Sequence, residues 1–210
     1  MWAAAMRPLL IGIAGGTGSG KSTVARRIVE SLPPDRAVVI EHDWYYLDRS
    51  HLSAQERALL NFDEPGALDN ARLLADLSAL REGRAAVCPQ YDFGTHTRLS
   101  AGRTVEPHPI VIVEGILLFA IHDLREAFDL RLFVDTDDDI RLLRRIRRDI
   151  EDRQRDIGSI ELQYRQSVRP MHHLYVAPSR QHAHLIIPEG GENAPALDVI
   201  VGRLRYLLGQ

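Results

Sequence analysis

The chain has 210 residues, 45% of them hydrophobic and 26% charged, which is typical of one globular domain with a well-buried core. Its net charge of −3 gives no overall positive field of the kind that attracts nucleic acid. The single cysteine, Cys88, excludes an intrachain disulfide and a four-thiolate metal site, as is usual in a reducing cytoplasm. We therefore expect a cytoplasmic protein of one domain over residues 1–210, without a nucleic-acid partner.

The N-terminal segment is apolar, but Arg7 and Pro8 interrupt it and Leu9–Ala14 leads directly into a glycine-rich loop. We interpret it as a buried strand and not as a signal peptide. The longest apolar run, Ile110–Ile121, contains Glu114. It falls short of the roughly 20 residues that span a bilayer, so no membrane partner is expected.

Short apolar runs alternate with longer stretches of helical period along the chain. The expected strands are Leu9–Ala14, Ala37–Ile40, Ile110–Val113, Leu130–Val134 and Leu185–Ile187. The expected helices are Lys21–Ser31, Asp69–Glu82, Asp137–Asp152, Ser159–Val176 and Ala196–Leu208. This alternation predicts an α/β fold with a parallel sheet covered by helices on both faces. Residues 84–106 show neither the helical period nor a buried apolar run, and we expect a β-hairpin flap there.

The loop between the first strand and the first helix, GGTGSGKS, has the spacing G-x-x-x-x-G-K-[ST]. Its glycines allow successive N–H groups to point at phosphate oxygens, and the helix start adds partial positive charge. We expect Lys21 to reach the transferring phosphate and Ser22 to coordinate Mg²⁺. The expected phosphate-binding residues are Gly15, Gly16, Thr17, Gly18, Ser19, Gly20, Lys21, Ser22 and Thr23.

Lys21 is the only lysine in the chain, and the other cationic side chains are arginines. A compact ammonium on a flexible stem suits a tight phosphate cradle that a planar guanidinium cannot fill. The missing lysines also exclude the N-K-x-D motif with which GTPases read guanine, and no L-S-G-G-Q element of transporter ATPases is present. A small-molecule kinase remains.

Two carboxylates follow predicted strands at the edge where open α/β sheets bind ligands. Glu114 is a candidate metal ligand, either direct or through water, and the alternative is a helix cap. Asp43 is a candidate catalytic base for the acceptor hydroxyl and a further metal-side candidate; the alternative is a strand-end or helix-capping Asp. Tyr45 and Tyr46 close behind Asp43 favour a pocket lining.

Residues 140–155 carry seven arginines. On a helical plot Arg141, Arg144, Arg145, Arg148 and Arg155 fall on one side, roughly opposite Leu143, Ile146, Ile150 and Ile157. A lid that clamps phosphates is favoured over a solvated helix face. A nucleic-acid contact is the third reading, and the interspersed acids Asp149, Glu151 and Asp152 weaken it.

The chain closely resembles the uridine kinase (uridine-cytidine kinase) family from the phosphate loop nearly to the C-terminus. The matching segments are GGTGSGKST, HDWYY, NFDEPGALD, PQYDFGTHTR, IVEGILLF, LFVDTDDDIRLLRRIRRDIEDRQRD, QYRQSVRPM and IIPEGGEN. The resemblance implies a P-loop kinase with a five-stranded parallel sheet, a nucleoside-binding flap over about residues 84–106 and an arginine-rich lid over about 137–165. It implies transfer of the γ-phosphate of ATP, or GTP, to the 5′-hydroxyl of uridine or cytidine with Mg²⁺.

The resemblance also implies residue roles. Asp43 matches the catalytic base, Tyr46 lies against the nucleoside, and Asp63 with Phe62 holds the ribose. Tyr91, Phe93 and His96 match the base-recognising positions. In the lid, Arg145 and Arg148 match phosphate-facing residues, and Arg148 is also expected to be catalytic. Arg155 and Gln163 match residues that contact the nucleoside, and Arg145 is expected to contact it as well. Gly158 is expected to break the helix before Gln163.

By itself His96 would be a surface-loop histidine; within YDFGTHTR it implies that both uridine and cytidine are accepted. Kinship alone implies a homotetramer inhibited by CTP or UTP. Three residues depart from the family pattern and affect the acceptor mouth: Trp44, Leu47 and Gln90. Four other histidines are interpreted as structural or solvent-facing: His172, His173, His182 and His184. The alternatives are a phosphoribulokinase-like or pantothenate-kinase-like enzyme and a non-catalytic nucleotide-binding regulator.

Overall fold

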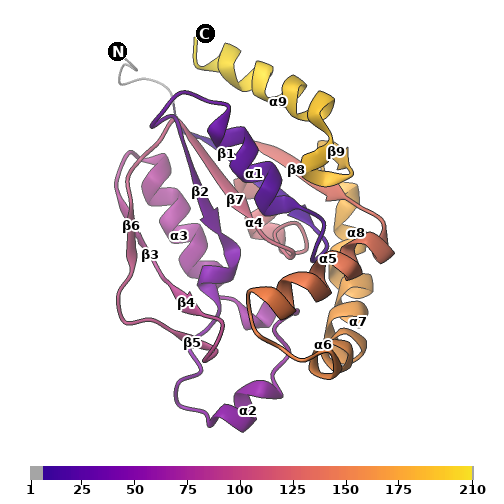
Figure 1. The fold of residues 1–210 in the computed structure, drawn as a ribbon. Helices are drawn as coiled ribbons and strands as arrows, with labels where there is room; N and C mark the ends of the chain where they lie inside the picture. Colours follow the sequence, from indigo (N-terminus) through magenta and orange to yellow (C-terminus); the bar gives the residue numbers. More distant parts are fainter. Residues whose placement is uncertain (1–6, 210) are drawn as a thin grey trace.

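The structure, a computed structural model, describes residues 7–209; for Met1–Met6 the expectation about a signal peptide lies outside the described residues. The central sheet has the order β2-β7-β1-β8-β9, and all neighbouring strands are parallel (Figure 1). The strands are β1 (Leu9–Gly15), β2 (Ala37–Glu41), β7 (Ile110–Glu114), β8 (Leu130–Asp135) and β9 (Leu185–Pro188). The predicted α/β fold with its five-stranded parallel sheet is therefore confirmed.

Each strand ends one residue later than expected. The additional residues lie just beyond the predicted apolar runs and are Gly15, Glu41, Glu114, Asp135 and Pro188. Hydrogen bonding between strands continues past the last apolar side chain, because pairing depends on the backbone. In the register, Glu41 of β2 lies beside Glu114 of β7. Carboxylates thus stand at the carboxyl edge of the sheet.

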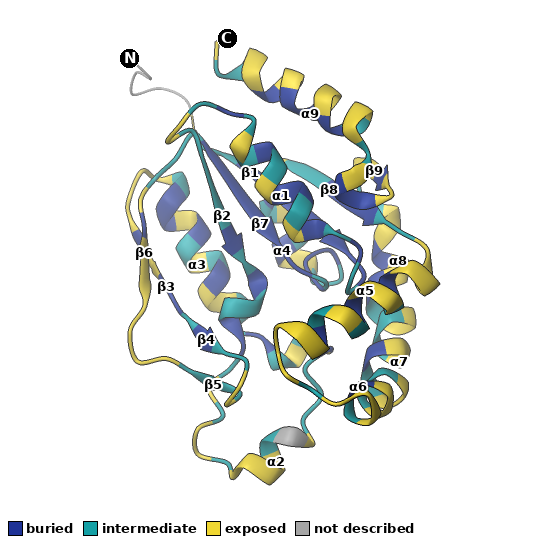
Figure 2. Ribbon diagram, in the orientation of Figure 1, coloured by how far each residue is buried: buried dark blue, intermediate teal, exposed yellow. Residues whose placement is uncertain are grey.

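Alternate side chains along the strands build two cores, one on each face of the sheet. Ile11 and Ile13 of β1 pack with α1 (Lys21–Glu30) and α9 (Ala194–Leu207). Leu10 and Ala14 pack with α3 (Asn70–Arg81) and α4 (His122–Ala127) on the opposite face. In Figure 2 the central strands β1 and β7 are dark with buried residues, and the outer faces of α1, α3 and α9 are exposed.

The expected helix over residues 159–176 is a longer run with two π-helical segments. It consists of α6 (Ile157–Gln163), η3 (Tyr164–Val168), α7 (Arg169–Met171), η4 (His172–Val176), α8 (Ala177–Ser179) and η5 (Arg180–His182). Arg169 and Ala177 donate their N–H groups five residues back, to Tyr164 and His172. Each stands directly before a proline, Pro170 or Pro178, whose missing N–H and ring disturb the ordinary ladder.

The break in the lid also differs from expectation. Helix α5 (Asp138–Glu151) ends first, and α6 begins at Ile157 with Asp156 as its N-cap, accepting from Ser159 N. Gly158 lies inside the first turn of α6, so the prediction that it breaks the helix is wrong. Asp156 is a better start signal because its carboxylate satisfies a free backbone N–H of the new helix.

Several short elements carry no clear sequence period. They are α2 (Ala54–Ala58), α4, and the 3₁₀ turns η1 (His42–Tyr45), η2 (Pro65–Ala67) and η6 (Gly190–Glu192). The predicted flap consists of two short antiparallel pairs, β3 (Ala86–Cys88) with β6 (Arg103–Val105) and β4 (Tyr91–Asp92) with β5 (Thr97–Arg98). Within residues 7–209, no helix is both long and apolar enough to cross a membrane.

Candidate active site

The loop between β1 and α1 has the backbone geometry of a phosphate cradle. Gly15, Gly18 and Gly20 have φ angles of 147°, 74° and 96°, which L side chains rarely adopt. Lys21 begins α1, and its buried ammonium donates to the carbonyl of Gly16 at 3.0 Å. The free N–H groups of the helix start and this ammonium together form an anion site.

Two carboxylates lie near Lys21 at the ends of neighbouring strands. Glu114 ends β7 and accepts a hydrogen bond of 2.6 Å from Ser22 Oγ, while Asp43 lies in η1 directly after β2. Burial raises the pKa of both carboxyl groups, and the charge of Lys21 opposes that rise. Burial also lowers the pKa of Lys21, and the two carboxylates oppose this shift. Lys21 and each carboxylate therefore stabilise one another's charged forms, whereas the charge of Asp43 disfavours that of Glu114.

Neither carboxylate is a helix cap. The next helix after Glu114 is α4, whose N-cap is Ile121, and the N-cap of η1 is Glu41. The cap interpretation is therefore wrong for Glu114 and Asp43, and both line a cavity of about 910 Å³ beside the phosphate loop.

The hydroxyl of Ser22 and the carboxylate of Glu114 are suited to hold Mg²⁺ together with phosphates and water. They do not form a site in which protein side chains alone surround a metal ion. Among the described residues, no group of three or more His, Cys, Asp or Glu side chains could hold a metal ion. Mg²⁺ is usually held by one or two protein oxygens and completes its shell with phosphates and water. The hydroxyl–carboxylate pair has this donor chemistry.

A cavity of about 910 Å³ joins the phosphate loop to the flap and the lid. It brings together these predicted site residues: Thr17, Lys21, Ser22, Asp43, Tyr46, Phe62, Asp63, Tyr91, Phe93, His96, Glu114, Arg145, Arg148, Arg155 and Gln163. The other predicted loop residues, Gly15, Gly16, Gly18, Ser19, Gly20 and Thr23, are not in its lining. Thr23 lies against Gly191 of η6 instead. The cavity is large enough for a small ligand beside bound phosphates.

Aromatic rings form the acceptor side of the cavity. Phe62 and His96 are stacked with their centroids 4.7 Å apart, and Tyr46 lies 5.1 Å from Tyr91 and 5.5 Å from Phe62. Tyr91 and Phe93 meet at 72°, edge to face. The two rings are not parallel, so they present one ring face and one ring edge to the cavity.

Asp63 places a buried carboxylate beside these rings. Its Oδ2 accepts a hydrogen bond of 3.0 Å from Ser167 Oγ of η3, and its backbone N–H donates to Asn61. Burial raises the pKa of Asp63, and the charge of Arg145 opposes the rise. A carboxylate with one oxygen already satisfied can accept hydroxyl hydrogen bonds with the other.

Helix α5 turns its arginine side inward. Arg145 is only 5% exposed, whereas Leu143 is 65% and Ile150 is 44% exposed. The interpretation as a solvated helix face is therefore wrong for Arg145, whereas Arg144, a member of the same predicted stripe, is exposed. Arg145 donates to Thr17 Oγ1 at 3.1 Å, which joins the lid to the phosphate loop, and to Gln163 Oε1 at 2.9 Å.

Two members of the predicted arginine stripe lie elsewhere. Arg155 is beyond the end of α5, yet its Nη1 reaches Gln163 Oε1 at 2.6 Å. Arg141 lies against the loop backbone, with Nε 3.0 Å from Thr136 O and Nη1 3.4 Å from Thr17 O, and it is absent from the lining of the large cavity. Arg141 supports the loop; it does not face the cavity.

Three residues of the site have no counterpart among the sequence-based expectations. Arg153 lies over the ring of Phe93 at 5.0 Å and also lines the cavity. Arg98 donates from the flap to the carbonyls of Tyr45 and Tyr46. Asp149, treated above as one of the acids on a charged helix, is fully buried among arginines. Its spacing of four residues from Arg145 and Arg153 was the available signal.

A parallel sheet, a phosphate loop carrying Lys21 and Ser22, carboxylates at the sheet edge and an arginine lid together define a P-loop kinase. Residues 10–196 match the Phosphoribulokinase / Uridine kinase family, and the chain belongs to this family.

The chain is 47% identical over 202 residues to a uridine kinase of Alkaliphilus metalliredigens, covering 96% of this chain and 97% of that protein. It is 46% identical over 205 residues to a uridine kinase of Clostridium novyi, covering 98% and 99% of the two chains. It is a nucleoside kinase by this kinship.

Solved structures show the same fold at low identity. A putative fructose transport system kinase from Silicibacter sp. TM1040 superposes with a TM-score of 0.69 at 21% identity, over 90% of this chain and 93% of that one. Phosphoribulokinase from Rhodobacter spheroides gives 0.65 at 14% identity, over 87% and 70%.

Proposed function

We propose that the protein transfers the γ-phosphate of ATP to the 5′-hydroxyl of uridine and of cytidine, forming UMP and CMP for pyrimidine salvage. The observation that carries the proposal is the single cavity that holds Lys21, Asp43 and Asp63 together with the flap aromatics. Near full-length identity of 46–47% to uridine kinases supports it independently.

In this proposal Lys21 and the loop N–H groups bind the β- and γ-phosphates, and Arg145 and Arg148 approach them from the lid. Ser22 and Glu114, with Asp43 nearby, would hold Mg²⁺, which would supply positive charge to neutralise the phosphates. Asp43 accepts the proton of the 5′-hydroxyl as that oxygen attacks the γ-phosphorus, while the bond from this phosphorus to the β–γ bridging oxygen breaks and ADP leaves. Its raised pKa brings it closer to the range in which a carboxylate is an effective base.

The nucleoside is held by the acceptor side of the cavity. Asp63 accepts from the ribose hydroxyls, with Phe62 beside it, and Arg155 and Gln163 contact the nucleoside from the lid. Tyr46, Tyr91 and Phe93 enclose the base, and His96 bonds its polar edge. Because an imidazole can either donate or accept, His96 can serve both the uracil and the cytosine edge. The flap (84–106) and the lid (137–165) belong to one domain.

Further parts of the proposal rest on kinship: GTP as an alternative donor, a cytoplasmic homotetramer, and no nucleic-acid or membrane partner. The alternative acceptors, ribulose 5-phosphate or pantothenate, carry a phosphate or carboxylate that needs cationic partners. The aromatic acceptor side argues against them, and retention of Lys21 and Asp43 argues against a silent regulator.

ATP consumption with uridine, cytidine, ribulose 5-phosphate and pantothenate, each offered alone, tests the proposal. We expect turnover with both nucleosides and none with the other two. Turnover with ribulose 5-phosphate or pantothenate alone would identify a different kinase, and no turnover with any acceptor would favour the regulator.

A further inference from the structure

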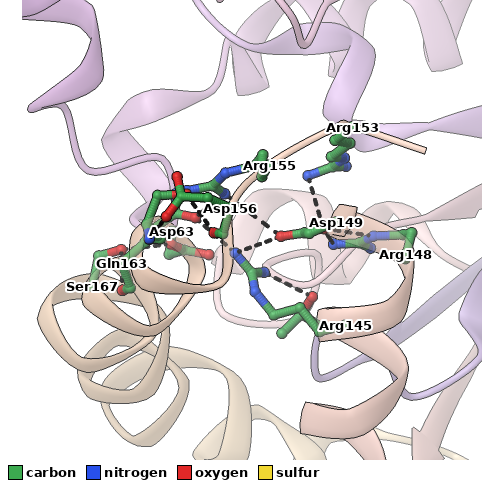
Figure 3. A network of polar contacts seen from close by, with 11 residues as sticks. Asp63, Arg145, Arg148, Asp149, Arg153, Arg155, Asp156, Gln163 and Ser167 are labelled. Atoms are coloured by element: carbon green, nitrogen blue, oxygen red, sulfur yellow. Dashed lines mark hydrogen bonds and ion pairs between the residues drawn. The ribbon is translucent and has the colours of Figure 1, made fainter. Parts of the chain in front are cut away.

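Asp149 lies at the centre of the lid and is fully buried, although it carries a carboxylate. Figure 3 shows four guanidinium groups converging on it, from α5 on one side and from the α5–α6 loop on the other. These groups belong to Arg145, Arg148, Arg153 and Arg155.

The two oxygens of Asp149 divide these arginines into two pairs. Oδ1 lies 2.8 Å from Arg148 and 3.7 Å from Arg153. Oδ2 lies 3.5 Å from both Arg145 and Arg155. One carboxylate therefore holds two cations on each side.

The four arginines serve both parts of the cavity. Arg148 is on the phosphate side, where its charge acts on Asp43. Arg153 also acts on Asp43, but it acts on Asp63 as well and lies over Phe93 on the nucleoside side. Arg145 and Arg155 share a second acceptor on the nucleoside side, Oε1 of Gln163, and Arg145 also reaches the phosphate loop through Thr17.

A single negative charge is too little for four guanidinium groups. Only Arg148 makes hydrogen bonds to the carboxylate, at 3.0 and 2.8 Å. Oδ2 accepts no hydrogen bond from any residue that the structure describes. Burial favours the protonated acid, but the arginines, Arg145 first, outweigh it and hold the pKa of Asp149 below its ordinary value. Asp149 is thus an anion shared among cations that retain free donors.

We propose that Asp149 is a positioning residue that couples ATP binding to nucleoside binding. This inference rests on the proposed nucleoside kinase function. When phosphates draw on Arg148, this arginine places less demand on Oδ1. More of the carboxylate's charge is then available to Arg145 and Arg155, which fix Gln163, and to Arg153, which lies over Phe93, so the nucleoside side is pre-organised.

The test is a linkage measurement. The dissociation constant of uridine is measured by calorimetry with and without a saturating non-hydrolysable ATP analogue and Mg²⁺, and the ratio gives the coupling. In the natural protein we expect the analogue to tighten uridine binding about fivefold or more, the lower end of ordinary coupling. In Asp149→Asn we expect the ratio to fall to about one, because the amide keeps the shape without the charge.

Glu151→Gln is the matched control, because Glu151 is on the same helix but pairs outward with exposed Arg147. It should keep the natural ratio. Circular dichroism and thermal melting check that each variant folds. If Asp149→Asn does not fold, Asp149→Glu replaces it, because this variant keeps the charge but displaces both carboxylate oxygens. The coupling ratio of Asp149→Glu should also fall.

An unchanged ratio in a folded Asp149 variant, or no coupling in the natural protein, would overturn the inference. Failure of the proposed function is a separate result, because it appears as absence of nucleoside turnover in the natural protein.

Discussion

Ser22 Oγ donates a 2.6 Å hydrogen bond to Glu114 Oε1, joining the first turn of α1 to the end of β7. The bond brings a hydroxyl and a buried carboxylate together beside Lys21. The register places Glu41 next to Glu114 on the neighbouring strand, but Glu41 does not line the large cavity. The cavity lining thus distinguishes Glu114, the proposed metal-side carboxylate, from Glu41, a neighbour of the same type.

Glu114→Gln should weaken the magnesium dependence of the reaction without unfolding the sheet. Removal of one metal-side carboxylate should raise the Mg²⁺ concentration for half-maximal activity by roughly 10- to 100-fold. A magnesium titration at fixed ATP measures the effect, with Glu41→Gln as the control. Equal shifts in both variants would remove Glu114 from the metal site.

His96→Tyr should change the choice between uridine and cytidine. His96 has a φ of 55° at the tip of the flap and stacks on Phe62, so a larger phenol there alters both the space and the hydrogen bonding at the base edge. We expect kcat/KM for uridine relative to cytidine to fall by about tenfold or more, with a smaller loss for cytidine. His51→Tyr, at an exposed position, is the control; a ratio equal to that of the natural protein in His96→Tyr contradicts the assignment.

Arg98→Ala should disconnect the flap from the loop that carries Asp43. Arg98 Nε donates to Tyr46 O at 2.8 Å, and its Nη2 donates to Tyr45 O at 3.1 Å and pairs with Asp69 at 3.2 Å. Without it, kcat/KM for uridine should fall by roughly 100-fold while the affinity for ATP stays near its natural value. Arg84→Ala is the control and should have little effect, because Arg84 pairs only with Glu82 at the surface. A parallel loss of ATP affinity in Arg98→Ala would instead show general damage to the structure.

Stability should decrease in acid in part through His172. Its Nε2 lies 3.2 Å from Arg141 Nη2, so it accepts that hydrogen bond as a neutral ring. Burial and then the charge of Arg141 lower its pKa from 6.5 to about 4, although Asp138 opposes the shift. The unfolded chain binds a proton between these pH values and the folded chain does not, so stability falls as pH drops from 6.5 towards 4.

His172→Gln, which keeps an acceptor for Arg141, should remove about 1–2 kcal/mol of this acid sensitivity after allowance for partial exposure to solvent. Urea unfolding at pH 7 and at pH 4.5 measures it. Equal losses in the two proteins would show that His172 is protonated in the folded state.

The sequence predicts this site well where chemistry depends on local pattern. The spacing around Lys21 defines the loop, and the ends of apolar runs place Glu114 and Asp43 at the sheet edge. The aromatic flap residues were assigned by resemblance, and they share the cavity with those groups.

The sequence predicts the site less well where tertiary packing determines which side chains face inward. A helical plot separates the arginine and apolar sides of α5 but does not say which side faces inward, so Arg145 could be read as solvated and Asp149 as a surface acid. Likewise the loop that brings Arg155 to Gln163 depends on Asp156, a start signal that Gly158 obscured.

The most direct test of the account is the position of the new phosphate on the product. The protein is incubated with ATP, Mg²⁺ and uridine, and the product is analysed by ³¹P and ¹H NMR, alongside Asp43→Asn. We predict 5′-UMP from the natural protein and a rate lower by about 10²- to 10⁴-fold in the variant, with ATP still bound. Phosphorylation of a 2′- or 3′-hydroxyl, no phosphorylated nucleoside, or full activity of Asp43→Asn would contradict it.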